Sequence, residues 1–221
     1  MTELRLEPRA VIADLDELAN ASGGRFAGAK RLAWTPQWVE ARSWLSSKLA
    51  DIGLGPDRDE AGNLWAGVDG AEEHFMIVGS HIDAVPDGGW LDGVLGLMTA
   101  LETVRQLVRA GTKPPIGVRF VDWADEEGAR FGRSLLGSSA CAGTLDPDEV
   151  RDLRDADGVT LGDALAVCGV DLDQAPAAMD RLKGAVAYLE LHIEQGPVLL
   201  DGGRLACAVS GTVGVERHLM T

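Results

Sequence analysis

The chain has 221 residues and a formal net charge of −15. This charge argues against a nucleic-acid partner, which needs a basic surface, and no apolar run is long enough to span a membrane. The N-terminus shows no apolar segment typical of a signal peptide, and the three widely spaced cysteines fit reduced thiols, so we expect a cytoplasmic protein.

The N-terminal third predicts two helices followed by two strands. Residues 11–19 have the apolar periodicity of an amphipathic helix. A second helix should begin with Thr35 as N-cap and Pro36 at its first position. Residues 64–68 and 75–79 are strand-like runs on either side of an Asp-Gly turn, a pattern typical of a β-hairpin.

The next segment predicts a parallel crossover. Residues 94–108 have helical periodicity, and residues 116–123 form a strand-like run. A strand, a helix and another strand in this order usually form a right-handed parallel unit. Residues 146–184 are polar and acidic, with short helices expected to start at Asp146 and Thr160.

The C-terminal part returns to strands. Residues 185–191 and 204–210 are strand-like, and glycines near position 211 suggest a hinge. We therefore expect a three-layer α/β/α fold with a mixed, mostly parallel central sheet. Residues 1–210 would form a metal-binding catalytic domain, and residues 211–221 a hinge and the first strand of a truncated lid or dimerisation domain.

Metal-ligand residues follow three of the predicted strands. His81 and Asp83 follow the first, residues 125–127 (Asp-Glu-Glu) the second, and His192 the third. Open α/β sheets place their sites outside the carboxyl ends of parallel strands, so we expect these side chains to meet. Imidazole and carboxylate together are the ligand set of a zinc-like hydrolytic centre.

Each of these residues also has a simpler interpretation. Asp92, in a Gly-rich turn before a helix, could be an N-cap. The three carboxylates could form a solvated acidic turn, and His81 and His192 could be ordinary histidines at strand ends. We favour a metal site because all candidates fall at equivalent ends of neighbouring strands.

Four segments, in order and spacing, resemble the hydantoinase/carbamoylase amidases. This family comprises N-carbamoyl-L-amino acid hydrolases, allantoate amidohydrolases and ureidoglycolate hydrolases, within the dinuclear metallopeptidase and aminoacylase superfamily. The resemblance extends from about Arg31 to the last residue. The segments are Gly-Ser-His-Ile-Asp at 79–83, Gly-Gly-Trp-Leu-Asp-Gly at 88–93, Asp-Glu-Glu-Gly-Ala-Arg-Phe at 125–131 and His-Ile-Glu-Gln-Gly-Pro at 192–197.

The resemblance implies a role for each matching position, and it also implies a cis peptide between Asp92 and Gly93. The implied roles are metal ligand for His81, Asp92, Glu127 and His192, general base for Glu126, orientation of His81 for Asp83, and substrate contact for Gln195. Within these roles, the two histidines hold one metal, Asp92 bridges both, and Glu127 holds the second.

The implied activity is hydrolysis of a linear C–N bond in a small carbamoyl or ureido substrate, with two divalent ions (zinc, or manganese, cobalt or nickel). His192, at a position that is usually acidic in the peptidase branches, favours the carbamoylase or allantoate branch. The full-length protein is expected to be a homodimer.

One departure from the family concerns the second metal, which normally takes a further His from a late segment. His74 should lie about 23 Å from His81 at ~3.3 Å per residue, and His218 lies beyond the hinge, so neither should substitute. We expect a complete first metal site and a deficient second one.

Two alternatives stay open: a metallo-aminopeptidase or aminoacylase of the same superfamily, and a non-catalytic truncated product. A serine hydrolase is disfavoured because residues 137–141 lack the final Gly of a nucleophile elbow. A dinucleotide enzyme is disfavoured because no Gly-x-Gly-x-x-Gly follows a strand.

Overall fold

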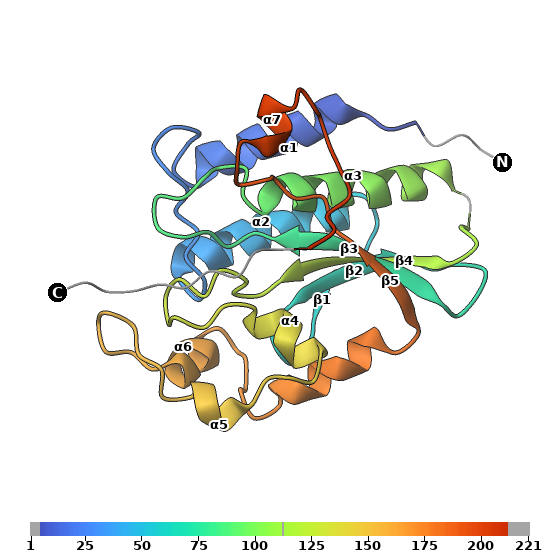
Figure 1. Ribbon diagram of the computed structural model, residues 1–221. Coiled ribbons are helices and arrows are strands. Elements are labelled where there is room, and N and C mark those ends of the chain that lie inside the picture. The colour runs from blue at the N-terminus through green and yellow to red at the C-terminus, as the bar shows by residue number, and fades with distance from the viewer. Residues whose placement is uncertain (1–4, 112, 212–221) are drawn as a thin grey trace.

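The computed structural model describes residues 5–111 and 113–211, and shows a sheet between two layers of helices (Figure 1). The elements in chain order are α1 Pro8–Ala21, α2 Pro36–Asp51, β1 Asp57–Arg58, β2 Leu64–Val68, β3 Phe75–His81, α3 Val94–Ala110, β4 Gly117–Trp123, α4 Leu136–Cys141, α5 Pro147–Val150, α6 Leu161–Val167, the 3₁₀ helix η1 Ala175–Leu182, β5 Ala185–Leu189 and α7 Val198–Asp201.

The sheet has the strand order β1-β2-β4-β3-β5. β3 pairs in parallel with β4 and β5, whereas β2 pairs antiparallel with β1 and β4. The predicted fold class, a mixed sheet with helices on both faces, is confirmed. The parallel strands β4, β3 and β5 all end at the same edge of the sheet.

The predicted hairpin between residues 64–68 and 75–79 is wrong. β2 instead lies beside β4, with Trp65 opposite Val121. The connection between β2 and β3 packs on the segment before β4, where the Ala71 N–H donates to the Pro114 carbonyl (2.8 Å). The chain therefore turns after β2 but places β4 between the two strands.

Ion pairs join α1, α2 and α3 into the layer on one face of the sheet (Figure 1). Asp14 of α1 pairs with Lys48 of α2 (3.1 Å) and with Arg105 of α3 (2.8 Å). The helices expected at these positions are confirmed, including Thr35 as N-cap of α2. α4 and η1 lie on the other face.

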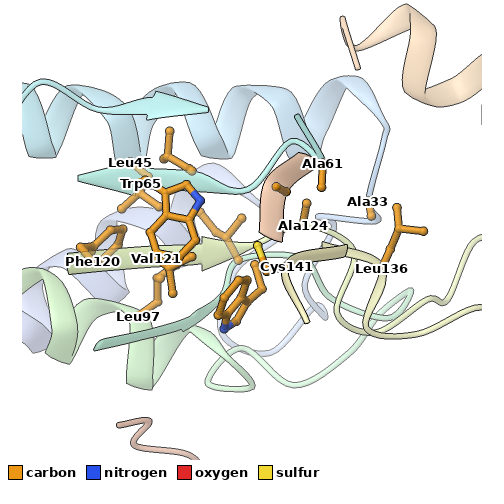
Figure 2. Packing of buried hydrophobic residues seen from close by; sticks show 14 of the residues in the cluster. Ala33, Leu45, Ala61, Trp65, Leu97, Phe120, Val121, Ala124, Leu136 and Cys141 are labelled. Carbon is orange, nitrogen blue, oxygen red and sulfur yellow. The ribbon is translucent and has the colours of Figure 1, made fainter. Parts of the chain in front are cut away.

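The sheet's two faces are packed with apolar side chains (Figure 2). Leu45 of α2, Leu97 of α3 and Phe120 of β4 have no exposed surface. Trp65 and Trp123 pack edge to face, with ring centroids 5.5 Å apart. This close packing fixes the position of β4 and, through it, the ends of the neighbouring strands.

The C-terminal part of the prediction is only partly met. Asp146 and Thr160 cap the short helices α5 and α6 as expected. The prediction of a strand over residues 204–210 is wrong, because these residues are irregular and exposed. The start of a second domain was expected over residues 211–221, and residues 212–221 lie outside the described residues. Among the described residues, no helix is both long and apolar enough to cross a membrane.

Candidate metal centre

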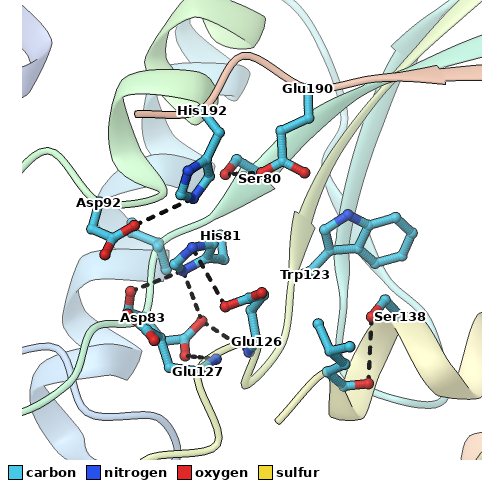
Figure 3. A network of polar contacts seen from close by, with 12 residues as sticks. Ser80, His81, Asp83, Asp92, Trp123, Glu126, Glu127, Ser138, Glu190 and His192 are labelled. Carbon is cyan, nitrogen blue, oxygen red and sulfur yellow. Dashed lines mark hydrogen bonds and ion pairs between the residues drawn. The ribbon is translucent and has the colours of Figure 1, made fainter. Parts of the chain in front are cut away.

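The candidate residues gather at the carboxyl edge of β3, β4 and β5 (Figure 3). His81 is the last residue of β3, and His192 follows β5 by three residues. The parallel register explains their proximity, because β3 lies between the other two strands. The two imidazole rings stack with their centroids 6.0 Å apart.

Three of the four expected ligands bring their donor atoms within 4.8 Å of one another: His81, Asp92 and His192. His192 Nε2 lies 3.3 Å from Asp92 Oδ1. Asp92 Oδ1 is buried, and within residues 5–111 and 113–211 it has no hydrogen-bond partner. The unpartnered carboxylate oxygen and the two imidazole nitrogens together form a set of electron-pair donors that could bind a divalent cation.

Backbone carbonyls orient both imidazoles. Nδ1 of His81 lies 3.1 Å from the carbonyl oxygen of Asp83, and Nδ1 of His192 lies 2.8 Å from that of Ile193. A ring that donates from Nδ1 leaves Nε2 free to accept a proton or a cation. The residues present therefore fit a metal centre.

Asp92 does not cap α3, so the simpler interpretation of this residue is wrong. The N-cap is Gly93, and no side chain caps the helix. Instead, Asp92 Oδ2 accepts a hydrogen bond from Gln195 Nε2 (2.7 Å), which places the side chain of Gln195 beside the candidate centre. The expected cis peptide is not found, since the described residues contain none.

Asp83 connects β3 to the loop after β4. Its carboxylate accepts the backbone N–H groups of Glu126 (3.2 Å) and Glu127 (3.1 Å). Its Oδ1 also lies 3.6 Å from His81 Nδ1. Asp83 thus holds the backbone of both glutamates, a function that the sequence did not indicate, while its carbonyl makes the closer contact with His81.

Glu126 and Glu127 follow a sharp turn at Asp125, whose φ is 53°. Glu126 Oε2 lies 3.6 Å from His81 Nε2, at the rim of the centre. The carboxylate of Glu127 does not belong to the three-donor group.

The carboxylates give the candidate centre an excess of negative charge. The neighbouring carboxylate of Asp92, 3.3 Å from Nε2, raises the pKa of His192 to about 9. Burial acts to lower the pKa of His81, but Asp83 and the glutamates outweigh it and raise this pKa to about 10. The negative surroundings that favour protons on the two imidazoles would also favour a cation, which could replace those protons.

Two nearby polar residues were not singled out from the sequence. Ser80 lies near the end of β3, and Glu190 lies just after β5. The Ser80 hydroxyl donates a hydrogen bond to Glu190 Oε1 (2.5 Å). This bond ties together the strand ends that carry His81 and His192. Glu190 and His192 both lie after the last residue of β5, so strand periodicity gave no sure indication that they would face the same side.

Fold and site together define an α/β domain with a candidate metal centre at the carboxyl edge of its parallel strands. The model of peptidase family M20/M25/M40 matches residues 77–218, and the chain belongs to this family, which is dependent on divalent metals.

Proteins similar to this chain are amidohydrolases by name. It is 37% identical to an N-carbamoyl-L-amino acid amidohydrolase of Geobacillus stearothermophilus, over 91% of this chain and 49% of that protein. It is 35% identical to an allantoate amidohydrolase of Escherichia coli strain K12, over 96% and 52%. A solved hydantoinase/carbamoylase family amidase from Burkholderia ambifaria superposes with a TM-score of 0.79 at 36% identity, over 90% and 48%. The chain spans about half the length of the relatives it matches.

Proposed function

We propose that this chain is the metal-binding part of an amidohydrolase that cleaves a linear C–N bond in a carbamoyl or ureido substrate, such as an N-carbamoyl-L-amino acid or allantoate. The observation that carries the proposal is the placement of His81, Asp92 and His192 beside Glu126. The names of the relatives supply the substrate class.

His81, Asp92 and His192 would hold one divalent ion, and Asp92 and Glu127 a second. Zinc, manganese, cobalt or nickel would suit this mixed donor set. When bound, such ions lower the pKa of water and polarise a carbonyl group. Gln195, hydrogen-bonded to Asp92, would lie beside the substrate.

Glu126 is the proposed general base. Burial raises the pKa of its carboxyl group, and the charges of Asp83 and Glu190 act in the same direction, whereas His81 and His192 oppose them. A carboxylate with a raised pKa accepts a proton from water more readily. Glu126 would then pass this proton to the leaving nitrogen, so that no net proton stays on the protein.

The wider organisation is part of the proposal. Residues 1–210 would form the catalytic domain, and residues 211–221 would begin a lid domain of a longer, cytoplasmic homodimer. The relatives are about twice as long as this chain, which supports the existence of a further domain.

Glu126→Gln in the full-length protein tests the function. The variant should lose activity by about 10²–10⁴-fold because the amide cannot accept the proton. Its metal content, measured by elemental analysis, should equal that of the parent. Near-normal turnover would show that Glu126 is not the base.

A substrate panel decides the reaction class. We expect the parent to hydrolyse N-carbamoyl-L-amino acids or allantoate in preference to dipeptides and N-acyl amino acids. Preference for the latter would instead favour an aminopeptidase or aminoacylase, and an inactive full-length protein with bound metal would favour a non-catalytic role.

A further inference from the structure

A buried asparagine far from the metal centre in sequence holds the loop that carries Glu126. Asn63, just before β2, has no exposed surface. Its Oδ1 accepts the backbone N–H of Ala124 (2.9 Å), and its Nδ2 donates to the carbonyl of Gly137 (3.1 Å). The Gly137 N–H in turn donates to the Ala124 carbonyl (2.9 Å). The side-chain amide thus bridges the two ends of the loop as a neighbouring peptide group would.

The loop continues this ladder up to the proposed base. The N–H groups of Leu136 and Leu135 donate to the carbonyls of Asp125 (3.1 Å) and Glu126 (2.7 Å). On the side of the metal centre, Asp83 accepts the N–H of Glu126. The backbone of Glu126 is therefore held between Asp83 and the ladder, and Asn63 closes the far end of that ladder.

Asp59 fixes which way the amide of Asn63 points. Its Oδ2 accepts hydrogen bonds from Asn63 Nδ2 (2.8 Å) and Trp65 Nε1 (2.8 Å), and its Oδ1 accepts the backbone N–H groups of Asn63 (2.9 Å) and Ala61 (3.0 Å). A flipped amide would place its oxygen against the Asp59 carboxylate and the Gly137 carbonyl. Only a group that donates and accepts at once fits this position.

The side-chain amide of Asn63 packs so closely against Gly137 that no side chain fits between them. A Cβ added to Gly137 would lie 1.9 Å from Asn63 Oδ1. Gly137 is therefore required for the close approach of the amide to the loop backbone.

We propose that Asn63, oriented by Asp59, is a positioning residue that sets the place of Glu126 relative to the metal centre. This inference rests on the proposed role of Glu126 as general base. Asn63 contacts neither the candidate ligands nor the proposed substrate position, so it acts only through the loop.

The first test is Asn63→Asp in the full-length, metal-loaded protein. The variant keeps the size of the side chain but replaces the donor with an acceptor that faces Asp59 and the Gly137 carbonyl. We expect kcat to fall by about 10²-fold, because a displacement of the base by about 1 Å costs that much, with KM and metal stoichiometry unchanged. Leu49→Ala, in the buried face of α2, is the control: it should lower the denaturation midpoint and leave kcat unchanged.

A double-mutant cycle covers the case in which Asn63→Asp does not fold. Gly137→Ala should lower kcat by pushing the amide away, and Asn63→Ala should lower kcat by removing it. A Cβ at position 137 would clash most severely with Asn63 Oδ1 (1.9 Å), and would also lie 2.9 Å from the backbone N of Ala124. Because Asn63→Ala removes the severe clash, the double variant should lose clearly less activity than the sum of the two single losses.

The outcomes separate this inference from the proposed function. A parent that hydrolyses the substrate panel and a Glu126→Gln variant that does not would uphold the function. If in that case Asn63→Asp kept the kcat of the parent, or if Leu49→Ala lost as much kcat as Asn63→Asp, the positioning role would be wrong. Additive losses in the double variant would also overturn it.

Discussion

Gly93 shows how closely the chain packs around His81, one of the candidate metal ligands. This residue has a φ of 67°, which side chains rarely adopt. A Cβ at this position would lie 2.4 Å from the His81 carbonyl oxygen and 2.5 Å from His81 Nε2. The glycine after Asp92 therefore serves two purposes: it turns the backbone into α3, and it leaves room for the ring of His81.

Gly93→Ala should weaken metal binding by about 10–100-fold, the range expected when the support of a ligand is disturbed. The added methyl group has to displace the ring of His81 or the turn that carries Asp92. Equilibrium dialysis against Zn²⁺ would measure the effect. Gly89→Ala is the matched control from the same turn, because its Cβ would come no closer than 4.0 Å to Asp92. Equal affinities for both variants would contradict this account.

The sequence indicated the candidate ligands better than the residues that hold them in place. His81 and His192 could be selected because each follows an apolar run, and Asp92 because it lies in a glycine-rich turn. Asn63 and the carboxylate contacts of Asp83 could not be selected. Their function depends on which loop the fold brings to them, and a polar residue beside a strand carries no mark of that in a single sequence.

At the scale of elements, the helices α1, α2, α3, α5 and α6 and the strands β2 to β5 were predicted, whereas α4, α7 and one strand pairing were not. The Asp-Gly sequence at 69–70 indicated a turn correctly, yet β2 pairs with β4 rather than with β3. A turn signal is local, whereas the partner of a strand is decided by burial. Leu64 and Trp65 are 4% and 2% exposed in their place between β1 and β4. Only knowledge of the whole sheet would have revealed this order.

β4 is tied to α2 by a buried ion pair whose stability should depend on pH. Asp122 Oδ2 lies 2.8 Å from Arg42 Nε, and Asp122 Oδ1 accepts the Ile82 N–H (2.8 Å). Burial raises the pKa of Asp122 from 3.8 to about 6, although the charge of Arg42 opposes this. Because the pKa is higher in the folded state, the contribution of this group to stability is fully present below pH 3.8 and is lost as the pH rises through about 6.

Asp122→Asn should therefore change the pH dependence of stability. The free energy of unfolding of the parent, minus that of the variant, should decrease as the pH rises from 4 to 7. Urea denaturation at several pH values in this window would measure it. A difference that stays constant with pH would mean that Asp122 does not titrate in the folded protein over this range.

At the scale of the whole molecule, the chain combines a net charge of −15 with a site that gathers several carboxylates around two imidazoles. Without a cation, these carboxylates repel one another, and part of the repulsion is relieved only by protons on the histidines. A divalent ion would supply the missing positive charge, so metal binding and folding stability should be coupled.

Adding Zn²⁺ or Mn²⁺ to the metal-free chain should therefore raise its melting temperature. A ligand at one hundred times its dissociation constant stabilises the folded state by about 2.7 kcal/mol, which corresponds to roughly 5–10 °C for a chain of this size. Differential scanning calorimetry with and without a chelator would measure the shift. His192→Ala should abolish it, because the three-donor group loses one member, whereas Glu126→Gln should keep it, because Glu126 is not a proposed ligand. An equal shift in the parent and in His192→Ala would mean that the ion binds elsewhere on the acidic surface, and the candidate centre would lose its main support.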